Sequence, residues 1–150
     1  MMSISPNSIG KLYFFAYDPY WKDQLDYYDV FPMVFPIDFY TDATNPGFLG
    51  INLHYLPPYV RARLMDALYQ TMNNQKYNKT TKLQITYNIL KSTSQFKMFK
   101  PCLHRYRFDR VRSAFQYISP EAWDYALLLP LARFKKAPIE QVWAESIMKA

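Results

Sequence analysis

The proline pair Pro57-Pro58 is the feature that most constrains how this 150-residue chain can fold. Proline has no backbone N–H and a fixed φ, so it ends a strand and is accepted at the first position of a helix. Before the pair, residues 48–55 alternate between two faces as a strand does. After it, Val60 and Leu64 begin an apolar stripe at helical spacing. The pair therefore predicts a change from strand to helix.

Two further segments before the proline pair have the composition of strands. Residues 11–17 are rich in aromatic side chains and end at a turn, which indicates a buried strand. Residues 30–37 contain Pro32 and Pro36, which cannot donate to a sheet ladder, so an edge strand or a bent strand is expected there. Residues 42–47 have the composition of a turn.

Helices are expected in most of the chain after residue 58. Residues 80–92 fit either a strand or a helix, and a helix is preferred because threonine can cap it. Short helices are expected in 96–118, one helix from Ser119 to just before Pro130, and a last one over 138–148. The predicted class is α+β: a small antiparallel sheet or partial barrel of about three N-terminal strands, followed by four to five helices. Residues 1–10 are expected to be a flexible arm and 11–150 one globular domain, strand-rich over 11–57 and helical over 58–150.

The charge of the chain is distributed unevenly along its length. Residues 1–58 carry two basic and six acidic side chains, which gives a net charge of −4. Residues 59–150 carry 16 basic and 6 acidic side chains, which gives +10. A basic half of this size attracts nucleic acid or an acidic protein surface, and a solvated basic face without a partner is the alternative.

Residue types that carry catalysis or bind metals do not form a motif. Cys102 and His104 are a lone pair of soft ligands, so no metal site, no cofactor and no catalytic residue are expected. Three glycines are too few for a phosphate-binding loop. The single cysteine fits a reducing compartment, and neither a signal peptide nor a membrane span is expected.

The acidic side chains between Asp18 and Asp42 leave one enzymatic alternative open. Paired carboxylates can bind magnesium in a nuclease, and Asp26 and Asp29 are the candidates. Because these acids lie in a predicted loop and are spaced by tyrosines, a solvated acidic loop or a docking surface for a basic partner is preferred.

The strongest functional candidate is the segment of residues 97–112, where basic and aromatic side chains alternate. Its basic groups can neutralise DNA phosphates, and its aromatic groups can stack on exposed bases. Equally, the aromatic groups can belong to the core while the arginines face water or an acidic neighbouring subunit. Both interpretations stay open. The candidate contact residues are Lys97, Lys100, Arg105, Arg107, Arg110 and Arg112.

Two other groups of residues are candidates for a protein interface and for structural roles in the predicted strand. Aromatic residues make up 19% of the chain, and those of the acidic front are candidates for a protein interface. In the strand predicted at 48–55, Gly50 permits close approach of a neighbour, while Asn52 and His54 on the same face have structural roles. The interface candidates are Tyr20, Trp21, Tyr27, Tyr28 and Phe31.

Several strings resemble short virion proteins of T4-like tailed phages that are labelled DNA end protector proteins. The resemblance lies in residues 27–36, in the Gly-Phe-Leu-Gly-Ile-Asn-Leu-His-Tyr-Leu-Pro string of 47–57, and in 61–64. It continues through 81–83 and 129–134, so it covers most of residues 11–145. The resemblance assigns a catalytic role to no residue of this chain.

The resemblance implies a non-enzymatic component of a virion, made in the host cytoplasm and located at the head–tail junction, neck, tail or baseplate. Its partners would be other virion proteins in a multi-subunit assembly, and possible contact with double-stranded DNA would protect the packaged ends. Direct end binding through the basic-aromatic segment is one alternative. A metal-dependent nuclease is the other.

Overall fold

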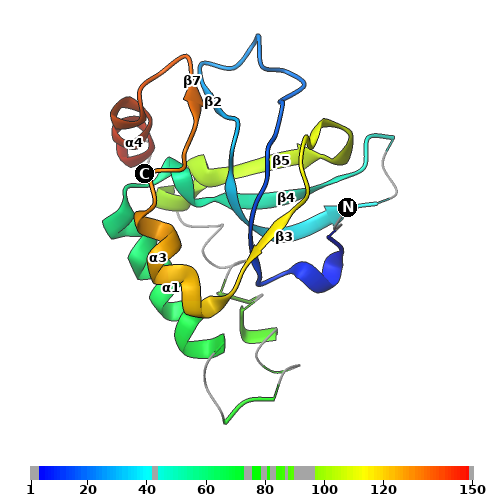
Figure 1. Ribbon diagram of the computed structural model, residues 1–150, viewed down its shortest axis with the longest axis vertical. Coiled ribbons are helices and arrows are strands. Elements are labelled where there is room, and N and C mark those ends of the chain that lie inside the picture. Colours follow the sequence, from blue (N-terminus) through cyan, green and yellow to red (C-terminus); the bar gives the residue numbers. More distant parts are fainter. Residues whose placement is uncertain are drawn as a thin grey trace.

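The computed structural model describes residues 4–41, 44–72, 76–78, 81, 84–86, 88–89 and 97–148, without the side chains of 67–69, 71–72 and 97–99. Its main element is an antiparallel sheet of five strands in the order β5-β4-β3-β1-β6 (Figure 1). A second sheet pairs β2 with β7. The strands are β1 (Leu12–Phe14), β2 (Tyr28–Asp29), β3 (Met33–Tyr40), β4 (Gly47–Asn52), β5 (Leu103–Arg107), β6 (Gln116–Ile118) and β7 (Phe134–Lys135).

The expectation of about three strands followed by four to five helices is wrong. Strands β5 and β6, from the part expected to be helical, form the two edges of the five-stranded sheet. The mixed basic and aromatic residues near Pro101 suggested short helices, but Phe48 of β4 pairs with Tyr106 of β5, and their rings stack 5.3 Å apart. This contact joins residues 58 positions apart in sequence, so no local pattern reveals it.

Of the two expectations for residues 30–37, an edge strand or a bent strand, the edge strand is wrong. Strand β3 lies between β4 and β1 instead of at an edge. Its proline is accepted there because β1 is short and pairs only with Met33 and Val34, while Pro36 lies beyond. The register with β4 shifts between Pro36 and Asp38, so the strand is irregular at the proline.

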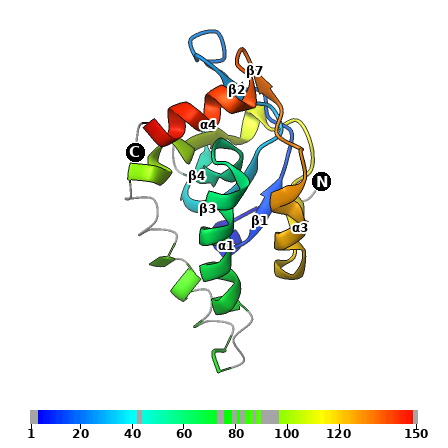
Figure 2. The same cartoon turned by 90° about the vertical axis from the view of Figure 1, so that its left-hand side faces the viewer.

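The helices α1 (Pro58–Met72), α3 (Trp123–Leu128) and α4 (Ile139–Met148) lie on one side of the five-stranded sheet (Figures 1 and 2). Val60, Trp123 and Val142 pack from these helices into one buried cluster with Phe35 and Ile51 of the sheet. Apolar burial on this face is the main force that holds the helices to the sheet. Among the described residues, no helix is long and apolar enough to cross a bilayer.

The opposite face of the sheet carries a second cluster that is mostly aromatic. Phe15, Phe48 and Tyr106 meet there with ring centroids 5.3 to 5.9 Å apart. Ile4 joins this cluster, next to the short 3-10 helix Pro6–Ser8. Of the segment at 80–92, residues 81, 84–86 and 88–89 are helical, and its other residues lie outside the described part.

Two glycines let β4 pack closely between its neighbours. A Cβ atom on Gly50 would collide with Cγ1 of Val34, and one on Gly47 would collide with the backbone carbonyl oxygen of Tyr106. The absence of a side chain at these positions therefore sets the spacing of β3, β4 and β5. Gly50 has the close neighbour that its place in the sequence suggested.

A buried carboxylate, Asp29, connects the two sheets. Its side chain is 1% exposed. Oδ2 of Asp29 accepts hydrogen bonds from Nδ2 of Asn52 at 3.0 Å and from Nδ1 of His54 at 2.8 Å. Oδ1 accepts from the backbone N–H groups of Phe31 and Arg133, both at 3.0 Å. Four bonds satisfy both oxygen atoms, which is the condition for a stable buried charge.

Asn52 extends this network to the backbone of β3. Its Oδ1 accepts from the backbone N–H of Met33 at 3.2 Å and from that of His54 at 3.0 Å. The carbonyl of His54 in turn accepts from Nε1 of Trp143 on α4 at 3.0 Å. The network therefore connects β2, β3, β4, α4 and the residue before β7.

The pKa of Asp29 reflects these contacts. Burial by itself raises the pKa, but the hydrogen bond and charge of His54, with the bonds from Asn52 and Phe31, bring it below its ordinary value. The ionised carboxylate is thus favoured in the folded protein. Its contribution to stability is present above the ordinary carboxyl pKa of about 3.9 and is lost as pH falls through the lower folded value.

We expect Asp29→Asn to lower the free energy of unfolding by about 1–3 kcal/mol, because the amide has a single acceptor oxygen and leaves buried donors of this network unpaired. Urea denaturation at pH 7 measures this. Asp26→Asn makes the same chemical change at an exposed side chain and should stay within about 0.5 kcal/mol of wild type.

The difference in stability between wild type and Asp29→Asn should depend on pH. We expect it to be constant above about pH 5 and to shrink below about pH 4, because the carboxyl of the unfolded wild type takes up a proton at a higher pH than the buried one does. Denaturation of both proteins across this range measures the difference. A constant difference down to pH 2.5 would contradict the lowered pKa of Asp29.

Candidate nucleic-acid interface

Four of the six predicted basic contact residues lie together at one end of β5. Arg105 and Arg107 are alternate residues of β5, so they project to the same side of the strand. Arg110 belongs to the 3-10 helix Phe108–Arg110, and Arg112 follows it. The two lysines lie in the 3-10 helix Lys97–Cys102, before the other end of β5; Lys100 is exposed, and the side chain of Lys97 lies outside the described residues.

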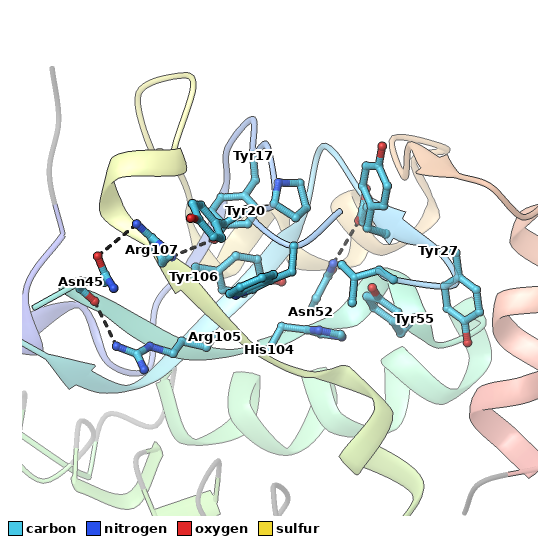
Figure 3. A pocket seen from close by; sticks show the side chains of 15 residues that line it. Tyr17, Tyr20, Tyr27, Asn45, Asn52, Tyr55, His104, Arg105, Tyr106 and Arg107 are labelled. Carbon is cyan, nitrogen blue, oxygen red and sulfur yellow. Dashed lines mark hydrogen bonds between the residues drawn. The ribbon is translucent and has the colours of Figure 1, made fainter. Parts of the chain in front are cut away.

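Asn45 fixes the positions of the two arginines on β5. Nη2 of Arg105 donates to its backbone carbonyl at 3.0 Å, and Nη2 of Arg107 donates to its Oδ1 at 3.1 Å (Figure 3). The guanidinium of Arg105 also lies 4.7 Å from the ring centroid of Tyr40. These contacts orient both groups in advance, which reduces the entropy lost when they bind an anion.

Tyr20 connects the strand arginines to Arg110. Its ring centroid lies 4.3 Å from the guanidinium carbon of Arg107 and 5.8 Å from that of Arg110. Tyr20 was a candidate for a protein interface, and the residue is 51% exposed. The acidic loop is therefore folded against the basic segment, and the two parts that are separate in sequence form one surface.

Acidic side chains neutralise part of this surface. Oδ2 of Asp18 lies 2.7 Å from Nη2 of Arg110 and 3.7 Å from Nη2 of Arg112, and Oδ1 accepts from Lys22 at 2.9 Å. Asp109 binds Arg107 through both carboxylate oxygens, at 3.0 and 2.7 Å. Within the described part of the chain, Arg105 has no carboxylate partner.

A pocket of about 310 Å³ opens beside these arginines. The loop after β1 forms one wall, and β4 and β5 form the other. Figure 3 shows Arg105, Arg107 and Asn45 at one end and Asn52, Tyr55 and Tyr27 toward the other. The lining is mainly aromatic: Tyr17, Tyr20, Trp21, Tyr27, Tyr28, Tyr55, His104 and Tyr106.

Burial keeps the inner side chains of the lining uncharged near neutral pH. Burial lowers the pKa of His104 to about 4, and its ring stacks on Tyr55 with centroids 4.4 Å apart. Burial also raises the pKa of the Tyr55, Tyr106 and Tyr17 hydroxyls above their ordinary values. The pocket therefore has a cationic end and a neutral aromatic interior.

The loop that forms the outer wall is held at both ends. At its start, Nε of Arg110 donates to the backbone carbonyl of Asp18 at 2.8 Å. Toward its other end, Nζ of Lys136 donates to the carbonyls of Lys22 and Leu25, at 2.8 and 3.0 Å. Lys136, next to β7, has a φ of 75°, which is a left-handed backbone conformation. Its side chain reaches the loop carbonyls from this position.

The other predicted interface residues lie in three different environments. Trp21 is 62% exposed, with its ring 4.9 Å from that of Tyr20. Tyr27 and Tyr28 are half-buried and line the pocket. Phe31 instead stacks on Phe14 with ring centroids 5.1 Å apart, so it belongs to the interior packing.

The geometry gives no support to the enzymatic alternatives. Cys102 is fully buried, and burial raises the pKa of its thiol to about 12. Nε2 of His104 lies 2.9 Å from the carbonyl of Pro101, a backbone contact. Asp29 already accepts four hydrogen bonds, while Asp26 is exposed. Among the described residues, no three His, Cys, Asp or Glu side chains converge as metal ligands do.

Sequence reasoning missed several residues of this site. Tyr17, Asn45 and Tyr55 lie outside the segment of residues 97–112, and their place in the pocket depends on the pairing of β4 with β5 and of residue 17 with Val111. The alternation of Arg105, Tyr106 and Arg107 is the one local signal that could have indicated a strand.

Comparison with known proteins gives one result that bears on this site. Residues 2–146 match the family described as phage T4 terminal DNA protecting protein. No curated protein and no solved structure matches the chain. The match covers nearly the whole chain and confirms the resemblance seen in residues 27–36 and 47–57. The chain therefore belongs to the phage T4 terminal DNA protecting protein family.

Proposed function

We propose that this protein binds the ends of phage DNA and shields them, without cleaving the DNA, through the arginine-rimmed pocket. The family supports the DNA-end part of this proposal. The single observation that supports this pocket as the DNA-binding site is that Asn45 holds Arg105 and Arg107 in place beside an aromatic pocket. Arginine neutralises backbone phosphates, and aromatic rings bind the faces of bases, so the two ends of the pocket suit the two parts of a nucleotide.

Arg105 is the residue through which the proposal is tested most cleanly. It has no carboxylate partner among the described residues, so its charge is available to a phosphate. The guanidinium of its neighbour Arg107 is already bound to the carboxylate of Asp109. A phosphate that binds both arginines must therefore compete with that carboxylate.

A second candidate function is a structural role in the virion, with contacts to neighbouring proteins. The exposure of Tyr20 and Trp21, at 51% and 62%, favours it. A virion location is compatible with end binding, because packaged DNA has its ends inside the particle. Mass spectrometry of purified particles tests this location, and absence of the chain from them would contradict it.

We expect Arg105→Ala to weaken binding to linear duplex DNA and to change its salt dependence. Each phosphate contact contributes about −0.9 to the slope of log K against log salt concentration, so the slope should become less steep by about 1. Fluorescence anisotropy of a labelled duplex between 50 and 200 mM salt measures both quantities.

Arg63→Ala is the matched control for this experiment. Arg63 is exposed on α1, away from the pocket, so its removal should leave the slope unchanged within about 0.3 of the wild-type value. Equal slopes for wild type and Arg105→Ala would contradict a phosphate contact at Arg105.

The carboxylate of Asp109 should oppose DNA binding. We expect Asp109→Asn to tighten binding by several fold at low salt, because it releases the guanidinium of Arg107 and removes a repulsive charge. The same anisotropy titration measures the gain. Asp124→Asn, an equal change at an exposed position on α3, should bind as wild type does. Weaker binding by Asp109→Asn would show that the ion pair is needed to orient Arg107.

A further inference from the structure

The size of the pocket limits which part of a DNA end can enter it. Its volume of about 310 Å³ lies at the lower end of the range for small-molecule sites. This is room for one nucleotide and too little for a base pair with its two backbones. A paired, stacked end can therefore contact the rim, but only a single unpaired nucleotide can occupy the interior.

The charges of the pocket give a bound nucleotide one orientation. Arg105 and Arg107 lie at one end, held by Asn45. The carboxylate of Asp29 borders the interior, and its repulsion disfavours a phosphate there. The phosphate is therefore expected at the arginines and the base among the aromatic rings (Figure 3).

The aromatic walls suit a base better than a sugar or a peptide group. Tyr106 forms part of the inner wall, where its 4% exposure shows that it is fixed in the core. Tyr20 and Trp21 lie in the outer wall, with Trp21 largely exposed. Rigid aromatic groups stack on any base, so this pocket selects for an accessible base and not for a sequence.

We propose that the pocket holds the last unpaired nucleotide of a DNA strand, with its phosphate on Arg105 and Arg107 and its base against Trp21 and Tyr106. This inference rests on the proposed end binding and names the group that is recognised. An internal nucleotide must be unstacked and rotated out of the duplex, whereas an unpaired terminal one is already accessible. Capture of a single nucleotide would thus explain how a small protein distinguishes an end from the interior of DNA.

The test compares three DNA hairpins of one stem sequence: a blunt end, a short single-stranded overhang, and a second loop that closes the end. We expect wild-type protein to bind the overhang most tightly. Trp21→Ala should lose about tenfold in affinity for the overhang and little for the closed form, because it removes one stacking partner. Equal wild-type affinity for blunt and overhang forms, or an unchanged Trp21→Ala, would overturn the inference.

Two variants control for indirect effects. Trp21→Phe retains an aromatic face and should keep most of the affinity for the overhang. Tyr125→Ala removes a ring that is 73% exposed on α3 and should bind as wild type does. Loss of binding in Tyr125→Ala, or equal losses in Trp21→Ala and Trp21→Phe, would argue against stacking in the pocket.

A free nucleotide separates failure of this inference from failure of end binding. Deoxyadenosine monophosphate at millimolar concentration should quench the fluorescence of Trp21, measured against the Trp21→Phe background, and Arg105→Ala should weaken the effect. If wild type binds linear and closed DNA equally, the proposed function fails, while quenching alone would still support the nucleotide pocket. If end preference is found without quenching, end binding stands and the nucleotide pocket is overturned.

Discussion

The buried carboxylate of Asp29 is the interaction on which the arrangement of the chain depends. It lies in β2 and receives hydrogen bonds from Asn52, from His54 and from the backbone of Arg133 just before β7. Asn52 carries the network into β3, and the carbonyl of His54 carries it to α4. A buried charge is tolerated only when its hydrogen bonds are complete, so these segments must assemble together.

The same carboxylate determines the character of the pocket. Asp29 and Asn52 border its interior, while the loop that follows β1 covers it from outside. Because the loop is held by Arg110 at one end and Lys136 at the other, its aromatic side chains are fixed opposite β5. The structure thus places an uncharged aromatic interior, bordered by one buried carboxylate, behind a cationic rim, which suits a nucleotide better than a free phosphate.

The sequence predicted the local features better than the pairing of distant segments. The start of α1 at Pro58 follows from proline chemistry and agrees with the structure. The strand predicted over 48–55 is shorter than expected, because β4 ends at Asn52 and Leu53–Tyr55 form a 3-10 helix. Residues 103–107 were predicted to be helical, but they form strand β5 because they pair with β4. Phe48 of β4 packs on Tyr106 from 58 positions earlier in the sequence, so the local sequence does not show this pairing. Of the two expectations for residues 30–37, the edge position was wrong for a related reason: the shortness of β1, which makes room for Pro36, is a property of the assembled sheet. The register shift between Pro36 and Asp38 fits the other expectation, a bent strand.

Only part of the candidate site could be predicted from the sequence. The arginines of residues 97–112 could be named from composition, but their connection through Asn45 and Tyr20 could not, since both lie more than fifty residues away. The acidic and the basic side chains lie in different parts of the sequence. In the folded chain Asp18 binds Arg110, so charge complementarity within the molecule builds one surface from both.

The central claim, that this protein protects DNA ends without cutting them, is tested most directly by digestion with an exonuclease that degrades linear duplex DNA from its ends. With saturating protein and no nuclease, the DNA should remain intact; after the exonuclease is added, its degradation should be delayed in proportion to the occupied ends. The Arg105→Ala variant should shorten that delay, and Arg63→Ala should not. Digestion at the same rate with and without wild-type protein would contradict the account.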